Sequence, residues 1–178
     1  MTSAESHPPP APFLLRGMAR ALDLGVLLLV MDLAYRCSRF LPSGGLFDIG
    51  DEALFWVDIG VGVSTFVTYT AVAEWLGSAT FGKHCTGLRV ASADGSGPIG
   101  LPAALIRNLA FYVDSLFLGI VAYSTIARSV RGQRLGDHWG RTVVLRRADA
   151  PEINAFRGWP VGMIAAFTLV MASYLLAS

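Results

Sequence analysis

Charged residues are scarce in this chain of 178 residues: 15% are charged and 53% are hydrophobic. A soluble domain has roughly 25% charged residues, so an ordinary cytosolic protein is a poor fit. Disordered chains show the opposite composition, which excludes that class. The formal net charge of +1 leaves no surplus to neutralise phosphates, so no nucleic-acid partner is expected. The composition predicts an integral membrane protein whose main partner is the lipid bilayer.

Metal-binding and catalytic residues are also few. The chain has two cysteines and three histidines, and their spacing closes no metal site: Cys37, Cys85, His7, His84 and His138. It contains no nucleophile elbow, no glycine-rich phosphate loop and no zinc-type His/Glu spacing. We therefore predict no cofactor and no enzymatic activity.

Hydrophobic segments are what the chain has instead. Four of them have about the length of a helix that crosses a bilayer, roughly 20 residues. These segments are Gly17 to Tyr35, Ala53 to Ala73, Ala103 to Ala127, and Trp159 to Ala177. Short strand-like pieces, Leu88–Ala91 and Thr142–Leu145, lie in the polar loops and can pair with each other. The predicted fold class is an all-α membrane protein, a small polytopic helical bundle.

Small residues recur every four positions in two of these segments. Gly158, Gly162 and Ala166 form one such stripe, and Gly60, Ser64 and Thr68 form another. Stripes of this kind let two helices approach closely. We expect both to be packing faces.

Four aspartates fall inside the apolar segments, where ionisable groups are costly and suggest a functional site. Arg16 and Asp23 are seven residues apart and share a helix face, and so do Arg107 and Asp114. These four residues form the predicted intramembrane polar site, as fixed ion pairs or as groups that handle ions or protons. Asp32 and Asp58, near segment ends, are expected to be exposed.

The loop arginines bear on orientation, because basic residues stay cytoplasmic. Four straight crossings with the N-terminus outside would keep the arginines from Arg128 to Arg157 inside. A cytoplasmic N-terminus with a bent or re-entrant third segment keeps more basic residues inside, and we favour it. The 25 residues of Ala103 to Ala127 are nevertheless ample for one crossing, so the path of this segment stays open.

Several short motifs follow one another along the chain, from Arg16-Gly17-Met18-Ala19 with Asp23 through Thr80-Phe81-Gly82-Lys83 to Gln133-Arg134-Leu135-Gly136-Asp137. In this order they resemble the RDD family of prokaryotic membrane proteins, which is named for one arginine and two aspartates. Arg16, Ala19 and Asp23 resemble the family's opening. The later matches are Thr80-Phe81-Gly82-Lys83, Gly87-Leu88-Arg89-Val90, Asp94-Gly95, Ile106-Arg107-Asn108-Leu109 with Asp114, Gln133-Arg134-Leu135-Gly136-Asp137, and Thr142-Val143-Val144. Asp114 and Asp137 both fit the second aspartate. The resemblance implies an RDD-like membrane domain (13–147). Composition and hydropathy add a disordered, polar and proline-rich tail before it (1–12), and a linker with an extra transmembrane helix after it (148–178).

The resemblance implies a bacterial inner-membrane protein and is compatible with a small transporter that handles cations or protons. Four helices enclose little volume, so a homo-oligomer is expected. The alternative is a non-transporting scaffold or assembly partner for another membrane protein, using a basic cytoplasmic face. The residues of that face are Arg128, Arg131, Arg134, Arg141, Arg146 and Arg147.

Overall fold

The computed structural model describes residues 10–38, 51–94, 97–114, 120–129, 131–150 and 158–177. The long helices are α1 (Phe13–Ser38), α2 (Asp51–Gly77) and α7 (Trp159–Ala177). The short ones are α3 (Phe81–Cys85), α4 (Leu101–Asp114), α5 (Ile120–Arg128) and α6 (Leu135–Trp139). Strand β1 (Leu88–Ser92) precedes α4, and strand β2 (Thr142–Arg146) follows α6. A 3₁₀ turn (Arg147–Asp149) comes after β2. The fold is mainly helical with one small sheet.

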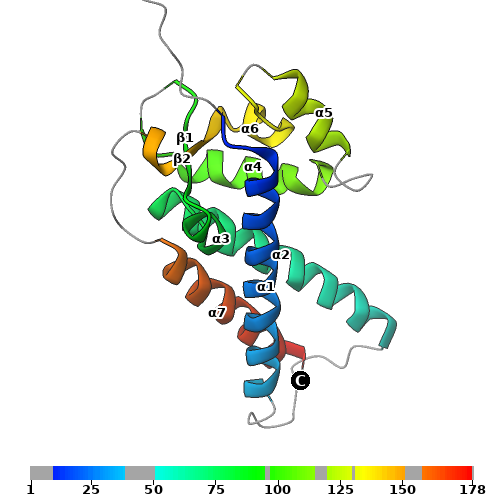
Figure 1. Cartoon of the computed structure of the whole chain (residues 1–178). Coiled ribbons are helices and arrows are strands. Elements are labelled where there is room, and N and C mark those ends of the chain that lie inside the picture. The colour runs from blue at the N-terminus through cyan, green and yellow to red at the C-terminus, as the bar shows by residue number, and fades with distance from the viewer. Residues whose placement is uncertain are drawn as a thin grey trace, which may run out of the picture.

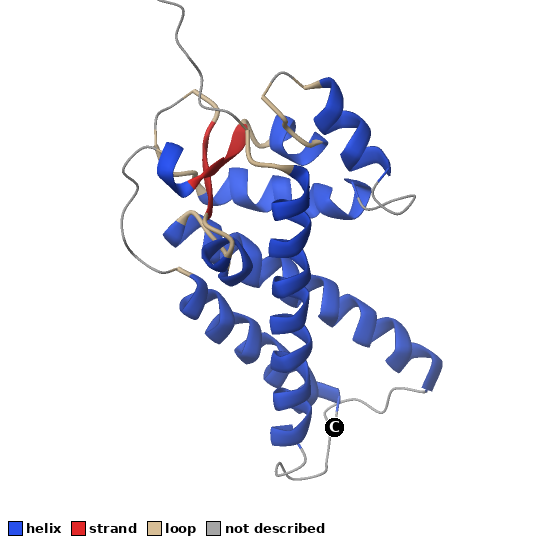
Figure 2. Cartoon of the chain, in the orientation of Figure 1, coloured by secondary structure: helices blue, strands red, loops and turns tan. Residues whose placement is uncertain are grey.

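The elements divide into a helical part and a cap. In Figure 1, α1 runs the length of the molecule, with α2 and α7 beside it. We call α3, α4, α5, α6 and the two strands the cap, because they gather around the N-terminal half of α1 (Figure 2). The C-terminal half of α1 extends away from the cap beside α7.

The sheet joins two loops that lie far apart in the sequence. β1 and β2 pair antiparallel, with Val90 opposite Val144. This pairing was predicted from the two strand-like pieces and is confirmed. The backbone of Ala11 adds a further hydrogen bond, from its N–H to the carbonyl oxygen of Val144 at 3.1 Å. The sheet thereby ties the start of α1 to the cap.

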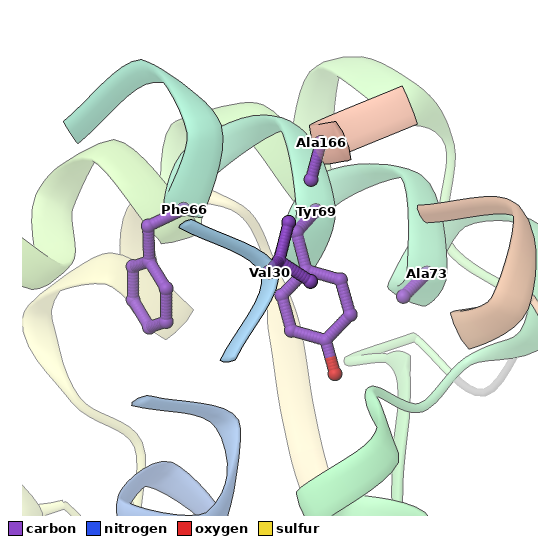
Figure 3. Packing of buried hydrophobic residues seen from close by; sticks show 5 residues of the cluster. All are labelled: Val30, Phe66, Tyr69, Ala73 and Ala166. Atoms are coloured by element: carbon purple, nitrogen blue, oxygen red, sulfur yellow. The ribbon is translucent and has the colours of Figure 1, made fainter. Parts of the chain in front are cut away.

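Close helix packing occurs where the α7 stripe was predicted. A Cβ at Gly162 would lie 2.6 Å from the carbonyl oxygen of Tyr69, and one at Gly158 would lie 2.6 Å from the Gly77 nitrogen. Ala166 is buried against the same helix in an apolar cluster with Val30, Phe66, Tyr69 and Ala73 (Figure 3). This packing face is confirmed.

The second stripe does not pack in the same way. Gly60 and Ser64 are both exposed, and a Cβ at Gly60 would meet nothing within 4 Å. Within the described part of the chain no other helix packs closely on Gly60, so the role of this stripe as a packing face stays a prediction. A homo-oligomer stays a prediction.

The bundle of four membrane-crossing segments is not confirmed. Two helices within the described ranges are long and apolar enough to cross a membrane, over Asp58–Gly77 and Trp159–Leu176. Helix α1 is 26 residues long, but it carries Arg16, Arg20 and Asp23 in its first half. Those charges lie beside the cap, so only the rest of α1 resembles a lipid-facing helix.

The third predicted segment is divided. Helix α4 has 14 residues and α5 has 9, both well short of the roughly 20 that a crossing needs. The two helices do not share one axis (Figure 1), and residues 115–119 between them lie outside the described residues. This arrangement agrees with the bent alternative and not with one straight crossing helix.

The predicted disordered tail is wrong at its C-terminal end. Residues 1–9 lie outside the described residues. Ala11, however, is 4% exposed and packs with Ala19, Leu88 and Val144. Its side chain is small and apolar, so the cap can bury it.

Candidate functional site: a buried network of charges

Asp23 is held by uncharged donors. Its carboxylate is fully buried and accepts hydrogen bonds from the Tyr69 hydroxyl at 3.0 Å, the Thr80 hydroxyl at 2.6 Å and the Gly82 N–H at 2.8 Å. Three donors suffice to stabilise a buried carboxylate. The predicted pairing with Arg16 is wrong, because seven helical residues rise about 10 Å along the axis and the donors from α2 and α3 are nearer.

Glu74 is the centre of a second group of contacts. It lies on α2 and is fully buried. Its carboxylate is 2.8 Å from Lys83 Nζ and 3.5 Å from Arg107 Nε. The Asn108 side-chain amide also donates to it at 2.8 Å. One carboxylate therefore joins α2 to both α3 and α4.

Asp137 is the centre of a third group. Its carboxylate lies 3.0 Å from Arg107 Nη2, 3.5 Å from Arg16 Nη1 and 3.7 Å from Arg134 Nε. Burial disfavours the charged form, but Arg107, Arg134 and Arg16 outweigh it and hold the pKa of Asp137 below its usual value. Asp137 is therefore ionised and links α6 to α1 and α4.

Asp114 is the least satisfied carboxylate of the four. Its side chain is 1% exposed, and Oδ2 lies 3.9 Å from Arg134 Nε. The Gly136 N–H donates to Oδ2 at 3.5 Å, at the limit of a hydrogen bond. Oδ1 has no hydrogen-bond partner in the described part of the chain. The predicted pair of Asp114 with Arg107 is wrong, because these two residues are also seven positions apart along a helix. Arg107 contacts Glu74 and Asp137 instead.

A cavity of about 370 Å³ lies beside this network. Its charged lining consists of Arg16, Arg20, Lys83, Arg107, Arg134 and Asp114. The apolar lining includes Phe13, Leu24, Phe111, Ala122, Ile126 and Val144. The Arg20 guanidinium stacks on Phe111, 4.1 Å from the ring centroid. Cationic and apolar groups therefore face one space.

The structure thus brings Arg16, Asp23, Arg107, Asp114 and Asp137 into one network, with partners different from those predicted. Sequence reasoning missed several of its members: Arg20, Tyr69, Glu74, Thr80, Lys83 and Asn108. Thr80, Lys83 and Asn108 were part of the family motifs, and that was the available signal. Glu74 directly follows the predicted segment Ala53 to Ala73, so the apolar pattern did not include it.

The predicted basic face is smaller than expected. Arg134 belongs to the network, and Arg131 is half-buried and donates to the carbonyl oxygen of Ala93 at 2.6 Å. The exposed members of the face are Arg128, Arg141, Arg146 and Arg147. Asp32 and Asp58 are exposed, as predicted. Within the described ranges, no three His, Cys, Asp or Glu side chains cluster as metal ligands.

Comparison with known proteins gives one match. A family model described as the RDD family matches residues 10–141, which is well over half of the chain. No curated protein and no solved structure matches. The matched range includes every residue of the buried network.

Proposed function

The chain belongs to the RDD family, and we propose that it is a small multi-pass transporter in which Asp114 binds and releases a proton at the cavity wall. Its family and its two apolar helices indicate a membrane protein. The observation that carries the transport proposal is the position of Asp114. Among the four carboxylates of the network, it is the one that lines the cavity. Its Oδ1 accepts no hydrogen bond from the described residues, whereas the Glu74 and Asp137 oxygens without a hydrogen bond are ion-paired with Lys83 and Arg107.

The surroundings of Asp114 favour proton exchange. Burial raises the pKa of Asp114 above its usual value, and Arg134 opposes that rise only partly. Arg134 also lies 3.7 Å from Asp137, so it keeps a carboxylate partner when Asp114 is protonated. Asp23, Glu74 and Asp137 each have two or more donors or cations and are better suited to fixed structural roles.

Asp114→Asn is expected to abolish protein-dependent proton movement, because asparagine cannot release a proton. The measurement is the internal pH of proteoliposomes after a sodium, potassium or phosphate gradient is imposed. Asp32→Asn is the matched control, since Asp32 is an exposed carboxylate that pairs with Arg36 on the surface. Full activity in Asp114→Asn contradicts the assignment. No pH change in the wild type under any gradient contradicts transport and favours the scaffold alternative.

We further propose that the cap lies in the cytoplasm of a bacterial inner-membrane protein. The four exposed arginines of the basic face belong to the cap or follow it directly, and basic residues favour the cytoplasmic side. The start of α1 lies at the same end as the cap (Figure 1), so the proposal puts the start of α1 on the cytoplasmic side as well.

The two native cysteines report this orientation. Cys85 is exposed in the cap, and Cys37 lies in the last turn of α1, about 35 Å or more from the cap end at 1.5 Å per residue. A membrane-impermeant thiol reagent is added to intact spheroplasts. It is expected to label the Cys85→Ser variant, whose remaining thiol is Cys37, and not the Cys37→Ser variant, whose remaining thiol is Cys85. Labelling of Cys37→Ser before lysis would contradict the proposed orientation.

A further inference from the structure

The cavity has more positive than negative charge. Five cationic side chains line it, against the single carboxylate of Asp114. Including the three carboxylates that lie behind the lining (Asp23, Glu74 and Asp137) still leaves an excess of one positive charge. A buried excess of charge is unfavourable unless a counter-charge is supplied. An anion bound in the cavity would supply this counter-charge.

Unsatisfied donors point to the same conclusion. Arg107 is fully buried and lines the cavity. Its Nε and Nη2 face Glu74 and Asp137, and its Nη1 has no hydrogen bond with any described residue. Nη1 of Arg20 is likewise buried and without a hydrogen-bond partner among the described residues. A buried donor left unpaired costs about 1–3 kcal/mol. Two guanidinium groups on one cavity thus have donors to spare for a ligand.

The nature of the donors selects the anion. Guanidinium groups match the oxygens of phosphate with paired N–H donors, and several of them can share one phosphate. The apolar lining from α1, α4 and α5 would suit a hydrocarbon chain attached to such a group. We propose that this cavity binds a phosphate group, either in a lipid headgroup or as free phosphate.

This inference goes beyond the proposed function, because equilibrium binding requires neither proton movement nor transport. If the protein binds phosphate but moves no protons, the phosphate site stands and the transport proposal fails. If it moves protons but binds no phosphate, the transport proposal stands and the phosphate site fails.

The test is equilibrium binding by the purified full-length protein in detergent. The probes are short-chain phosphatidic acid, the matched diacylglycerol without phosphate, and inorganic phosphate. Binding of phosphatidic acid but neither of the others identifies a lipid headgroup, whereas binding of inorganic phosphate with equal affinity identifies free phosphate. Failure of both phosphate probes to bind, or equal binding of diacylglycerol and phosphatidic acid, overturns the proposal.

Two pairs of variants locate the site. Arg20→Gln removes a cavity cation and is expected to weaken binding on the order of tenfold or more, while Arg141→Gln changes an exposed arginine outside the cavity lining and is expected to leave binding unchanged. Ala122→Phe fills the cavity from α5 without removing any charge, and Ala127→Phe is its control on the exposed face of that helix. Unaltered affinity in folded Arg20→Gln or Ala122→Phe contradicts this location.

Discussion

Replacing Asp137 with asparagine is expected to lower the free energy of unfolding by about 3–5 kcal/mol, because it leaves buried cations without their counter-charge. Arg107 is the most affected, since it is fully buried and its Nη2 lies 3.0 Å from Asp137. The measurement is denaturant unfolding in mixed micelles. Asp32→Asn, which removes one partner of an exposed pair, is the control and should change little.

The same variant tests the charge state of Asp137. Three arginines hold the pKa of this carboxyl below its usual value, so its stabilisation is fully present above the unfolded-state pKa. That stabilisation is lost as the pH falls through the folded-state pKa. Asp137→Asn should therefore lose less stability than the wild type on acidification. An unchanged acid dependence would show that Asp137 is not held as an ion.

Gly82→Ala is the second change with a large expected effect. A Cβ at this position would overlap the carbonyl oxygen of Ala19 and lie 3.0 Å from the Asp23 carboxyl carbon. α1 and α3 would have to separate, which costs roughly 1–3 kcal/mol. The charge-assisted bond from the Gly82 N–H to Asp23 would weaken as well, at about 1.5–3 kcal/mol.

The expected result is a loss of several kcal/mol, or failure to accumulate in the membrane. Gly25→Ala is the matched control on α1, because a Cβ at Gly25 would meet nothing within 4 Å. Stability of Gly82→Ala equal to that of Gly25→Ala would contradict the close approach of α1 and α3.

Local patterns in the sequence were enough to predict part of the fold. The period of four in Gly158, Gly162 and Ala166 predicted the α7 face, because close packing depends on residue size alone. The strand pieces around Val90 and Val144 predicted the sheet. Both features depend on short-range patterns that tertiary contacts reinforce.

The partners of the buried charges could not be read in this way. A shared helix face suggested Arg16 with Asp23 and Arg107 with Asp114, but residues seven apart are about two turns apart along the axis. The actual partners come from other elements, as with Glu74 on α2 and Lys83 on α3. Such pairs depend on how the cap folds over α1, which no local spacing specifies.

The most direct test of the account is the protonation of Asp114 itself. Infrared difference spectra of the reconstituted wild type across a pH change should show the carbonyl band of a buried carboxylic acid. The band should be retained in Asp32→Asn and absent in Asp114→Asn. A band that survives in Asp114→Asn, or no such band in the wild type, would contradict Asp114 as the proton-binding group.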